Sequence, residues 1–175
     1  PCGNITPLGV TGTPVIDAAS KTLYVAAMTS GPKHQLFALS LDDGSPRAGF
    51  PVDVSGVKAG SQSFNASEQN QRGSLVLLNG TVYIPYGGHF GDCGGYHGWV
   101  IGVPVHASGA TPIAWATKAH AGGIWAPGAL SSDGKSVFAA TGNTMSDSGG
   151  ILSSPATWGH GNAIAQVYNH VIMPL

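Results

Sequence analysis

The chain has 175 residues, of which 42% are hydrophobic and only 9% are charged, and its formal net charge is −1. A chain of this length and apolar content can bury a core, so we expect one folded domain rather than disorder. Because the 7 Lys and Arg residues form no basic stripe and no apolar run approaches the roughly 20 residues that cross a bilayer, we expect neither nucleic-acid binding nor a membrane span.

The Gly and Pro content indicates strands and loops rather than helices. The chain contains 27 Gly and 12 Pro, which favour turns and disfavour helix interiors. It has a single Glu, Glu68, and almost no window has apolar residues at helical spacing. We therefore expect an all-β fold of short strands joined by long loops.

A short apolar run, a turn and a second apolar run follow one another three times along the chain. The first runs with their turns cover residues 13–17, 74–80 and 128–134, and the second runs cover residues 22–26, 81–85 and 136–140. The second runs begin 59 residues (81 − 22) and 55 residues (136 − 81) apart. Asn-Gly and Asp-Gly turns supply the positive φ of a tight hairpin. Recurrence at such a period predicts a repeat architecture.

Each hairpin is followed by further strands. Third strands are predicted at 35–41, 98–103 and 162–167, and fourth strands at 50–54 and 112–116. Four antiparallel strands in a unit of roughly 40 to 50 residues are typical of a propeller blade. We predict a partial β-propeller of about three four-stranded antiparallel blades, a single incomplete segment with units at about 9–55, 70–117 and 122–168. Three blades would leave sheet edges open, so we expect the remaining blades or a second chain as a partner.

The residues of these units resemble a known family. Residues 9–17, 23–25, 35–39 and 42–44 are similar to a blade of the quinoprotein-type β-propellers, which are built of pyrroloquinoline-quinone-like repeats. Arg72 and residues 96–100, 123–125 and 140–143 extend the resemblance over nearly the whole chain. The resemblance implies a secreted or periplasmic protein. In the family's enzymes, pyrroloquinoline quinone and Ca²⁺ lie at the propeller centre, and hydride passes from the substrate to the quinone.

The cofactor machinery of that family is not recognisable in this stretch. The chain has no adjacent cysteines, and the tryptophan-docking signature is matched only by Ala38, Leu39 and Gly44, with Phe50 roughly where Trp would fall. We therefore expect a module that binds a small-molecule ligand or a partner. The alternative is part of a quinone-dependent dehydrogenase that oxidises an alcohol or a sugar, with pyrroloquinoline quinone and calcium bound in the full-length protein.

Residues 89–97 place four potential metal ligands within nine residues. They are His89, Asp92, Cys93 and His97, which zinc would accept if the glycines folded the loop back. The spacing matches no standard metal pattern, so we assign no metal and keep the two histidines and the aspartate as candidate ligand-binding residues. The other interpretation is a Gly-rich loop that joins two strands.

Trp125 and Arg72 are two further candidates for ligand binding. Trp125 is predicted to begin an inner strand of the third unit near a central channel, where it would stack on a flat ligand or pack between blades. Arg72 has a comparable position in the second unit. A buried Arg must find acceptors, either carbonyl or carboxylate groups of the protein or an anionic ligand.

The two cysteines, Cys2 and Cys93, permit one disulfide, or two buried thiols. Residues 91–95 are also similar to the nucleophile segment of chymotrypsin-like cysteine proteases, which makes such a protease a remote alternative. Its base would be His34. Its candidate acids would be Asp42, Asp43 and Asp53.

Three Asn residues match the N-glycosylation pattern: Asn4, Asn65 and Asn79. Pro7 disfavours the first of them, which leaves Asn65 and Asn79 as candidate glycosylation sites. Asn79 also belongs to an Asn-Gly turn that needs it for backbone reasons. Asn65 and Glu68 are in addition candidate Ca²⁺ ligands, or else solvated side chains of a polar loop.

Overall fold

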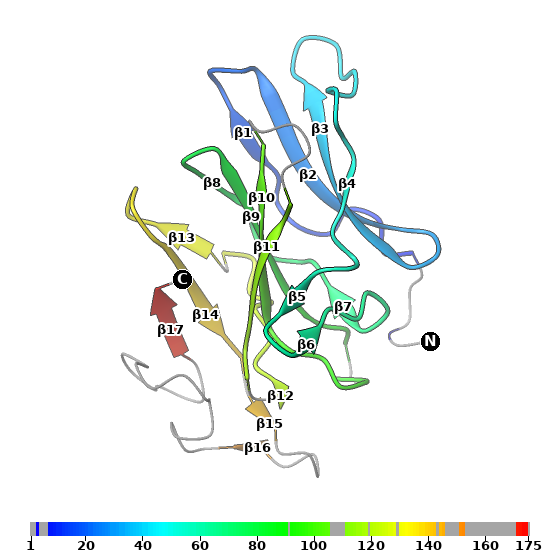
Figure 1. Ribbon diagram of the computed structural model, residues 1–175, viewed down its shortest axis with the longest axis vertical. Helices are drawn as coiled ribbons and strands as arrows, with labels where there is room; N and C mark the ends of the chain where they lie inside the picture. The colour runs from blue at the N-terminus through cyan, green and yellow to red at the C-terminus, as the bar shows by residue number, and fades with distance from the viewer. Residues whose placement is uncertain are drawn as a thin grey trace.

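The computed structural model describes residues 3, 7–90, 92–105, 111–118, 120–128, 130–142, 144–145, 151–152 and 171–174. All the regular elements of these residues are β-strands, arranged in antiparallel sheets of two to five strands (Figure 1). The prediction of an all-β fold is confirmed. Over the same residues no sheet closes on itself, and no helix is long and apolar enough to cross a membrane.

The first sheet has four strands in chain order. They are β1 (Val15–Asp17), β2 (Thr22–Thr29), β3 (Lys33–Ser40) and β4 (Val52–Asp53). Tyr24 lies opposite Val15 on one side and Ala38 on the other. Burial alternates along β3, because successive side chains of a strand point to opposite faces. The four strands coincide with the strands predicted for the first unit, within a few residues at each end.

The second sheet has five strands. They are β7 (Gln69–Asn70), β8 (Val76–Leu78), β9 (Thr81–Gly88), β10 (Trp99–Pro104) and β11 (Ile113–Ala116). β7 and β8 pair with different halves of the same edge of β9, and the order across the rest of the sheet is β9-β10-β11. In the β8–β9 turn, Asn79 and Gly80 have φ values of 49° and 74°. This is the positive-φ hairpin turn that the sequence predicted.

The third sheet consists of β13 (Leu130–Ser132), β14 (Val137–Thr141) and β17 (Val171–Pro174), in that order. The predicted third strand at 162–167 lies outside the described residues. Short strands that were not predicted make up the remaining sheets. They are the hairpin of β5 (Lys58–Ala59) and β6 (Gln62–Ser63), and the sheet of β12 (His120–Ala121), β15 (Thr144–Met145) and β16 (Ile151–Leu152).

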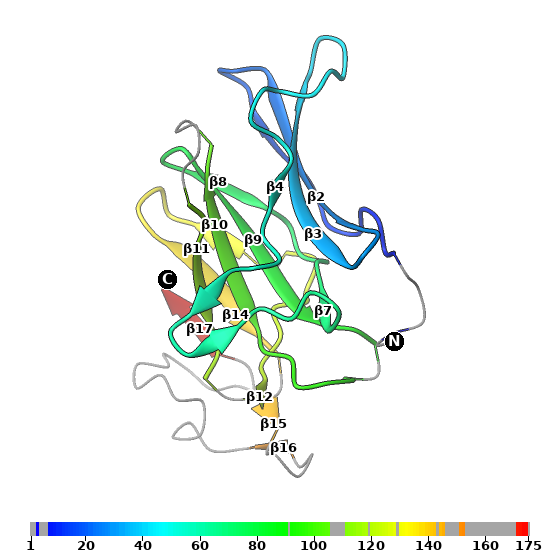
Figure 2. The ribbon, with the colours of Figure 1, turned by 45° about the vertical axis from the view of Figure 1, so that its right-hand side comes forward.

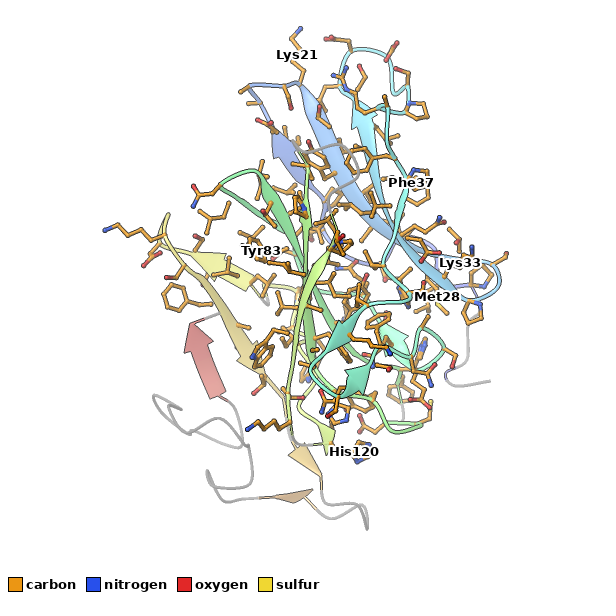
Figure 3. All side chains as sticks on the ribbon, viewed as in Figure 1. Lys21, Met28, Lys33, Phe37, Tyr83 and His120 are labelled. Atoms are coloured by element: carbon orange, nitrogen blue, oxygen red, sulfur yellow. The ribbon has the colours of Figure 1, made fainter. Side chains whose placement is uncertain are left out.

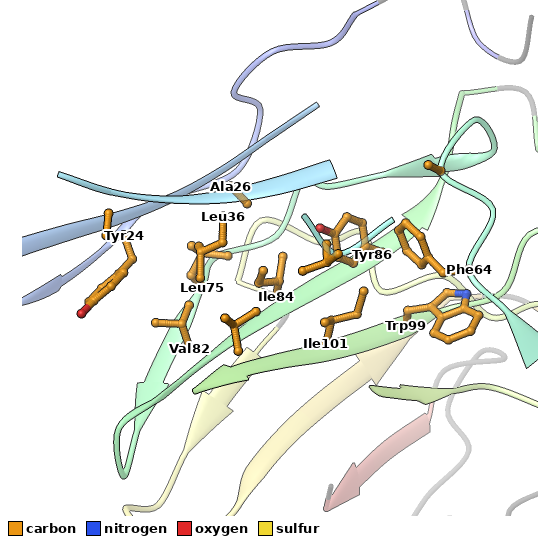
Figure 4. Close-up of a cluster of buried hydrophobic side chains, with 14 of the residues drawn as sticks. Tyr24, Ala26, Leu36, Phe64, Leu75, Val82, Ile84, Tyr86, Trp99 and Ile101 are labelled. Carbon is orange, nitrogen blue, oxygen red and sulfur yellow. The ribbon is translucent and has the colours of Figure 1, made fainter. Parts of the chain in front are cut away.

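The first, second and third sheets lie side by side in chain order, with the second sheet in the middle (Figure 2). Side chains fill the space between these layers (Figure 3). Tyr24, Ala26 and Leu36 of the first sheet face Val82, Ile84 and Ile101 of the second (Figure 4). A second apolar cluster joins the opposite face of the second sheet to the third, and its buried members are Val100, Ile124, Leu130, Val137 and Ala139. The second sheet is therefore covered on both faces.

The sheets meet at the first strands of their hairpins, because β8 contacts both β1 and β13. Two backbone hydrogen bonds link the residues just before these strands. The Leu75 amide donates to the Thr13 carbonyl at 3.0 Å, and the Ser74 amide donates to the Pro127 carbonyl at 2.8 Å. These bonds bring together three segments that are far apart in the sequence.

Candidate functional site

Three chain segments converge at this junction. We call them the pre-strand segments: residues 9–14 before β1, residues 69–75 before β8 and residues 122–128 before β13. Each is anchored near the far end of the second strand of the hairpin that follows it, which is β2, β9 or β14. Gly9 exchanges backbone hydrogen bonds with Met28 of β2, at 3.1 and 2.9 Å, and the Gly142 amide after β14 donates to the Gly123 carbonyl at 2.8 Å. In the second sheet, β7 makes the corresponding pairing with β9.

Arg72 and Trp125 lie together on two of the pre-strand segments. The guanidinium carbon of Arg72 is 6.0 Å from the centroid of the Trp125 ring, within the range of a cation–π interaction. Both residues are exposed, and Trp125 keeps 46% of its surface in contact with solvent. Among the described residues no carboxylate forms an ion pair with Arg72. The pair therefore presents a flat aromatic surface beside a cation with free donors.

The Trp125 side chain packs closely on two glycines, Gly87 and Gly142. A Cβ atom at position 142 would overlap Nε1 of Trp125, and one at position 87 would lie 3.2 Å from its Cβ. The prediction that Trp125 begins a strand is wrong, since residues 122–125 belong to no strand. Two backbone hydrogen bonds hold them instead: the Ile124 amide donates to the Tyr86 carbonyl of β9 at 3.0 Å, and the Gly123 carbonyl accepts from the Gly142 amide at 2.8 Å. Glycines 122 and 123, packed directly on their neighbours, keep this segment close to β9 without sheet pairing.

Gln71 joins the first two pre-strand segments. Its carbonyl accepts a hydrogen bond from the Thr11 hydroxyl, and its side chain lies so close to Gly12 that any Cβ there would overlap it. The Gln71 amide nitrogen donates to the Gly73 carbonyl at 2.6 Å. The Gln71 Oε1 atom is buried and has no hydrogen-bond partner among the described residues. Neither Thr11 nor Gln71 was singled out from the sequence, because their contact depends on how two sheets meet.

The loop that carries His89, Asp92 and His97 does not gather them into one site. His89 is buried, and burial lowers its pKa, which the Ser67 backbone partly opposes. Asp92 accepts a hydrogen bond from the Tyr96 hydroxyl at 2.6 Å. The pKa of Tyr96 is raised first by burial and then by this carboxylate. Nδ1 of His97 lies 3.3 Å from the amide nitrogen of Gln62. The three side chains thus have separate partners.

Cys93, in the same loop, is disulfide-bonded. The only other cysteine of the sequence, Cys2, lies outside the described residues. A disulfide sulfur offers no thiolate to a metal or a substrate. Over the part of the chain that the structure describes, no group of three or more His, Cys, Asp or Glu side chains is arranged to hold a metal ion.

His34 is a buried structural residue rather than an exposed base. Its Nε2 lies 3.1 Å from the carbonyl oxygens of both Ala66 and Gln69, and its ring contacts Phe64 and Tyr86 edge-on. Burial lowers the pKa of His34 to about 4, and the two backbone hydrogen bonds only partly oppose this. The acids Asp42, Asp43 and Asp53 lie in exposed positions. Together with a disulfide-bonded Cys93, this arrangement gives no support to a cysteine protease.

The two candidate calcium ligands, Asn65 and Glu68, contact different parts of the chain. Oδ1 of Asn65 accepts hydrogen bonds from the Ser67 amide at 3.2 Å and from the Ser67 hydroxyl at 2.8 Å. The Glu68 side chain covers the backbone of Gly94. Asn65 and Asn79 are both exposed, and Asn4 lies outside the described residues. Exposure leaves the two described asparagines accessible to glycosylation.

An open groove of about 490 Å³ lies between the β5–β6 hairpin and β11. Ala114 and Ala116 of β11 belong to the face that packs on the first core cluster, so small side chains leave this space. None of the predicted ligand-binding residues lines it. The lining residues are Ala59, Gly60, Ser61, Gln62, Ala114, Trp115, Ala116 and Lys118.

Of the five residues predicted to bind a ligand, the structure brings Arg72 and Trp125 into direct contact. They stand at the junction of the three sheets, on segments held by backbone hydrogen bonds. No protein-family model, curated protein or solved structure matches the chain.

Proposed function

We propose that this chain is a segment of a propeller-type β protein that binds a ligand at the junction of its pre-strand segments. The observation that carries the proposal is the exposed Arg72–Trp125 pair. A ligand that suits this pair is flat and carries a carboxylate. Its ring would lie against the indole, and its charge would accept hydrogen bonds from the guanidinium group.

The propeller-type arrangement is supported by the order and contacts of the sheets. Three antiparallel sheets follow one another in chain order, and each contains a hairpin whose first strand lies nearest the junction. Ligands of propellers bind where the inner strands converge. The Arg72–Trp125 pair is at the equivalent place, immediately before β8 and β13.

The physical balance favours a ligand role over a purely structural one. A cation–π contact at an exposed site stabilises by about 0.5–1 kcal/mol. This is small compared with the free energy that burial of the half-exposed indole would contribute. The Trp125 side chain also packs closely on Gly87 and Gly142, so little rotamer entropy is lost when a ligand stacks on it. The chain keeps a preorganised aromatic surface facing solvent.

Pyrroloquinoline quinone is flat and carries several carboxylates, so its ring system fits this pair in outline. Its use in catalysis also requires Ca²⁺, and the described residues bring no group of carboxylates together for the ion. Asn65 bonds to Ser67, and the Glu68 side chain lies against Gly94. We therefore assign no catalytic step to a quinone, and the dehydrogenase alternative rests on the family resemblance alone.

The test is a binding titration with two probes, 2-naphthoate and pyrroloquinoline quinone, each with and without Ca²⁺, followed by isothermal calorimetry. We expect Arg72→Gln and Trp125→Leu each to weaken binding about tenfold, which corresponds to about 1.4 kcal/mol. Gly142→Ala should act similarly, because it displaces the indole without changing either partner. Lys135→Gln, which removes an exposed cation elsewhere, and Gly56→Ala, outside the pre-strand segments, where a Cβ meets nothing within 4 Å, are the matched controls.

Binding that is unchanged in the Arg72, Trp125 and Gly142 variants would overturn the proposal, as would no binding of either probe by the unaltered chain. Dye-linked oxidation of an alcohol or a sugar after addition of pyrroloquinoline quinone and Ca²⁺ would favour the dehydrogenase alternative.

A further inference from the structure

The side of the first sheet that faces away from the second sheet is apolar. Because successive side chains alternate, the residues next to buried Tyr24 and Leu36 point to this side. We call it the outer face of the first sheet, and it comprises Ile16, Leu23, Val25, Phe37 and Leu39. Cross-strand pairing places Ile16 beside Leu23, Leu23 beside Leu39, and Val25 beside Phe37. Phe37 is labelled on β3 in Figure 3.

None of these five residues belongs to either core cluster. Ile16 is 54% exposed, and Leu41, which follows β3, is 45% exposed. Leu23, Val25 and Phe37 are only partly buried. A contiguous apolar sheet face of this kind marks a site of association.

The register of the strands shows what normally covers such a face. Tyr24 pairs with Ala38 in the first sheet as Tyr83 pairs with Gly102 in the second. By this alignment, four residues of the outer face, namely Leu23, Val25, Phe37 and Leu39, correspond to Val82, Ile84, Ile101 and Val103. Each of the latter four is 0% exposed, because the first sheet covers them with its Tyr24 face. The same apolar pattern is thus fully buried in one sheet and only partly buried in the other.

The third sheet presents the complementary type of face. Phe138 pairs with Ser131 as Tyr24 pairs with Val15, so Phe138 holds the position of Tyr24. Val137 and Ala139 are buried against the second sheet, and Phe138 and Ala140 therefore point away from it. We call these two residues the outer face of the third sheet. Both are only partly buried.

We infer that the outer face of the first sheet binds the outer face of the third sheet of a second copy of this chain. The inference rests on the propeller-type arrangement proposed above, and it names the partner. This type of contact already occurs twice within one chain, between the first and second sheets and between the second and third. Because the two faces differ, the contact is head-to-tail, and two copies close it by using each face once.

The test begins with sedimentation velocity of the full 175-residue chain over a range of concentrations, where we expect a dimer. Val25→Asp places a charge on the outer face of the first sheet, and Phe138→Asp does so on the third. Each variant alone should be a monomer. An equal mixture of the two should again form dimers, because the intact face of each variant can bind the intact face of the other. Ser63→Asp, at an exposed position on β6, is the control and should leave the dimer unchanged.

Circular dichroism checks that each variant is folded, and Phe37→Lys replaces Val25→Asp if the latter is not. An unaltered chain that stays monomeric at high concentration would overturn the inference. So would a Phe138→Asp chain that still dimerises, since the contact would then involve two identical faces, or a mixture that fails to restore the dimer. Arg72→Gln should not affect the dimer, so the failure of ligand binding and the failure of dimerisation can be told apart.

Discussion

Two sheet faces in this molecule carry apolar residues at the same register positions but differ in how far they are buried. The face of the second sheet that contains Ile84 and Ile101 is completely buried, whereas the outer face of the first sheet, with Val25 and Phe37 at the same register positions, is partly open. The difference shows that apolar alternation specifies a face that can be buried. It does not specify what buries it.

Both faces of the first sheet are apolar, as they are in the second sheet, which is covered on both sides. A sheet between two layers needs apolar side chains on both sides, and the second sheet has them in both core clusters. The first sheet has the composition of such a middle layer although only one of its faces is covered within the chain. Its outer face is therefore the place where a further sheet is expected.

The largest difference between the faces should appear in a pair of matched truncations. Ile101→Ala removes a fully buried side chain and should lower the free energy of unfolding by about 2–5 kcal/mol, because a cavity is left behind. Phe37→Ala, at the corresponding position of the open face, should cost less than about 1 kcal/mol at dilute protein concentration. Urea denaturation of both variants measures the two values.

The cost of Phe37→Ala should rise with protein concentration if a second copy covers this residue, because association stabilises only the folded chain. Ile101→Ala should show no such additional dependence. Equal costs for the two truncations at low concentration would contradict the comparison, since they would mean that both positions are buried alike.

Acid should weaken the packing between the first and second sheets, where the His34 ring contacts Phe64 and Tyr86. Its pKa in the folded chain is about 4, below the ordinary value of 6.5. The unfolded chain therefore binds a proton at a higher pH than the folded chain does. The free energy of unfolding is therefore highest above pH 6.5, where His34 is neutral in both states. It falls as the pH is lowered toward 4, by up to about 3 kcal/mol in total.

Unfolding curves between pH 7 and pH 4 check this expectation. The His89 pKa is also lowered and acts in the same direction, so the effect of His34 is the difference in pH dependence between the unaltered chain and His34→Gln. Identical pH dependence in the two proteins would show that His34 remains accessible to protons in the folded state. Proton NMR of the His34 ring gives its pKa independently.

The smallest expected effects concern the hairpins that set the register of the two faces. Lys21 and Asn79 both have φ of 49°, a conformation that Asn adopts more readily than Lys. Lys21→Asn should raise the free energy of unfolding by up to about 1 kcal/mol, and Asn79→Lys should lower it by a similar amount. Thermal unfolding measures both changes.

Lys21 also forms an ion pair of 3.0 Å with Asp42, in which both side chains are well exposed. Such a pair is worth about 0.2–1 kcal/mol, so Asp42→Asn is the control that isolates it. If Lys21→Asn destabilised the chain by more than this control, the turn would not limit the stability of the first hairpin.

Local sequence features were sufficient to predict the hairpins. The first-sheet strands and the β8–β9 turn follow from apolar alternation and from Asn79-Gly80, because a tight turn requires positive φ. The short strands β5, β6, β7 and β12 could not be predicted. They have only two residues each, too few to show a period, and their pairing depends on contacts with distant segments.

The candidate site was predicted only as separate residues. Arg72 and Trp125 were recognised as side chains able to bind a ligand, but their contact depends on how the pre-strand segments meet. The prediction of a strand at Trp125 failed because glycines 122 and 123 keep that segment against β9 through packing and backbone hydrogen bonding. The contributions of Thr11, Gln71 and Gly142 involve residues up to 60 positions apart.

The sequence by itself determined the all-β class, the three hairpins and the apolar character of the sheet faces, because each depends on neighbouring residues and on side-chain alternation. Only the tertiary structure decided which faces are covered, where the sheets meet, and that Arg72 lies over Trp125. Those outcomes depend on contacts between distant segments, which are fixed when the sheets pack and which no local pattern specifies.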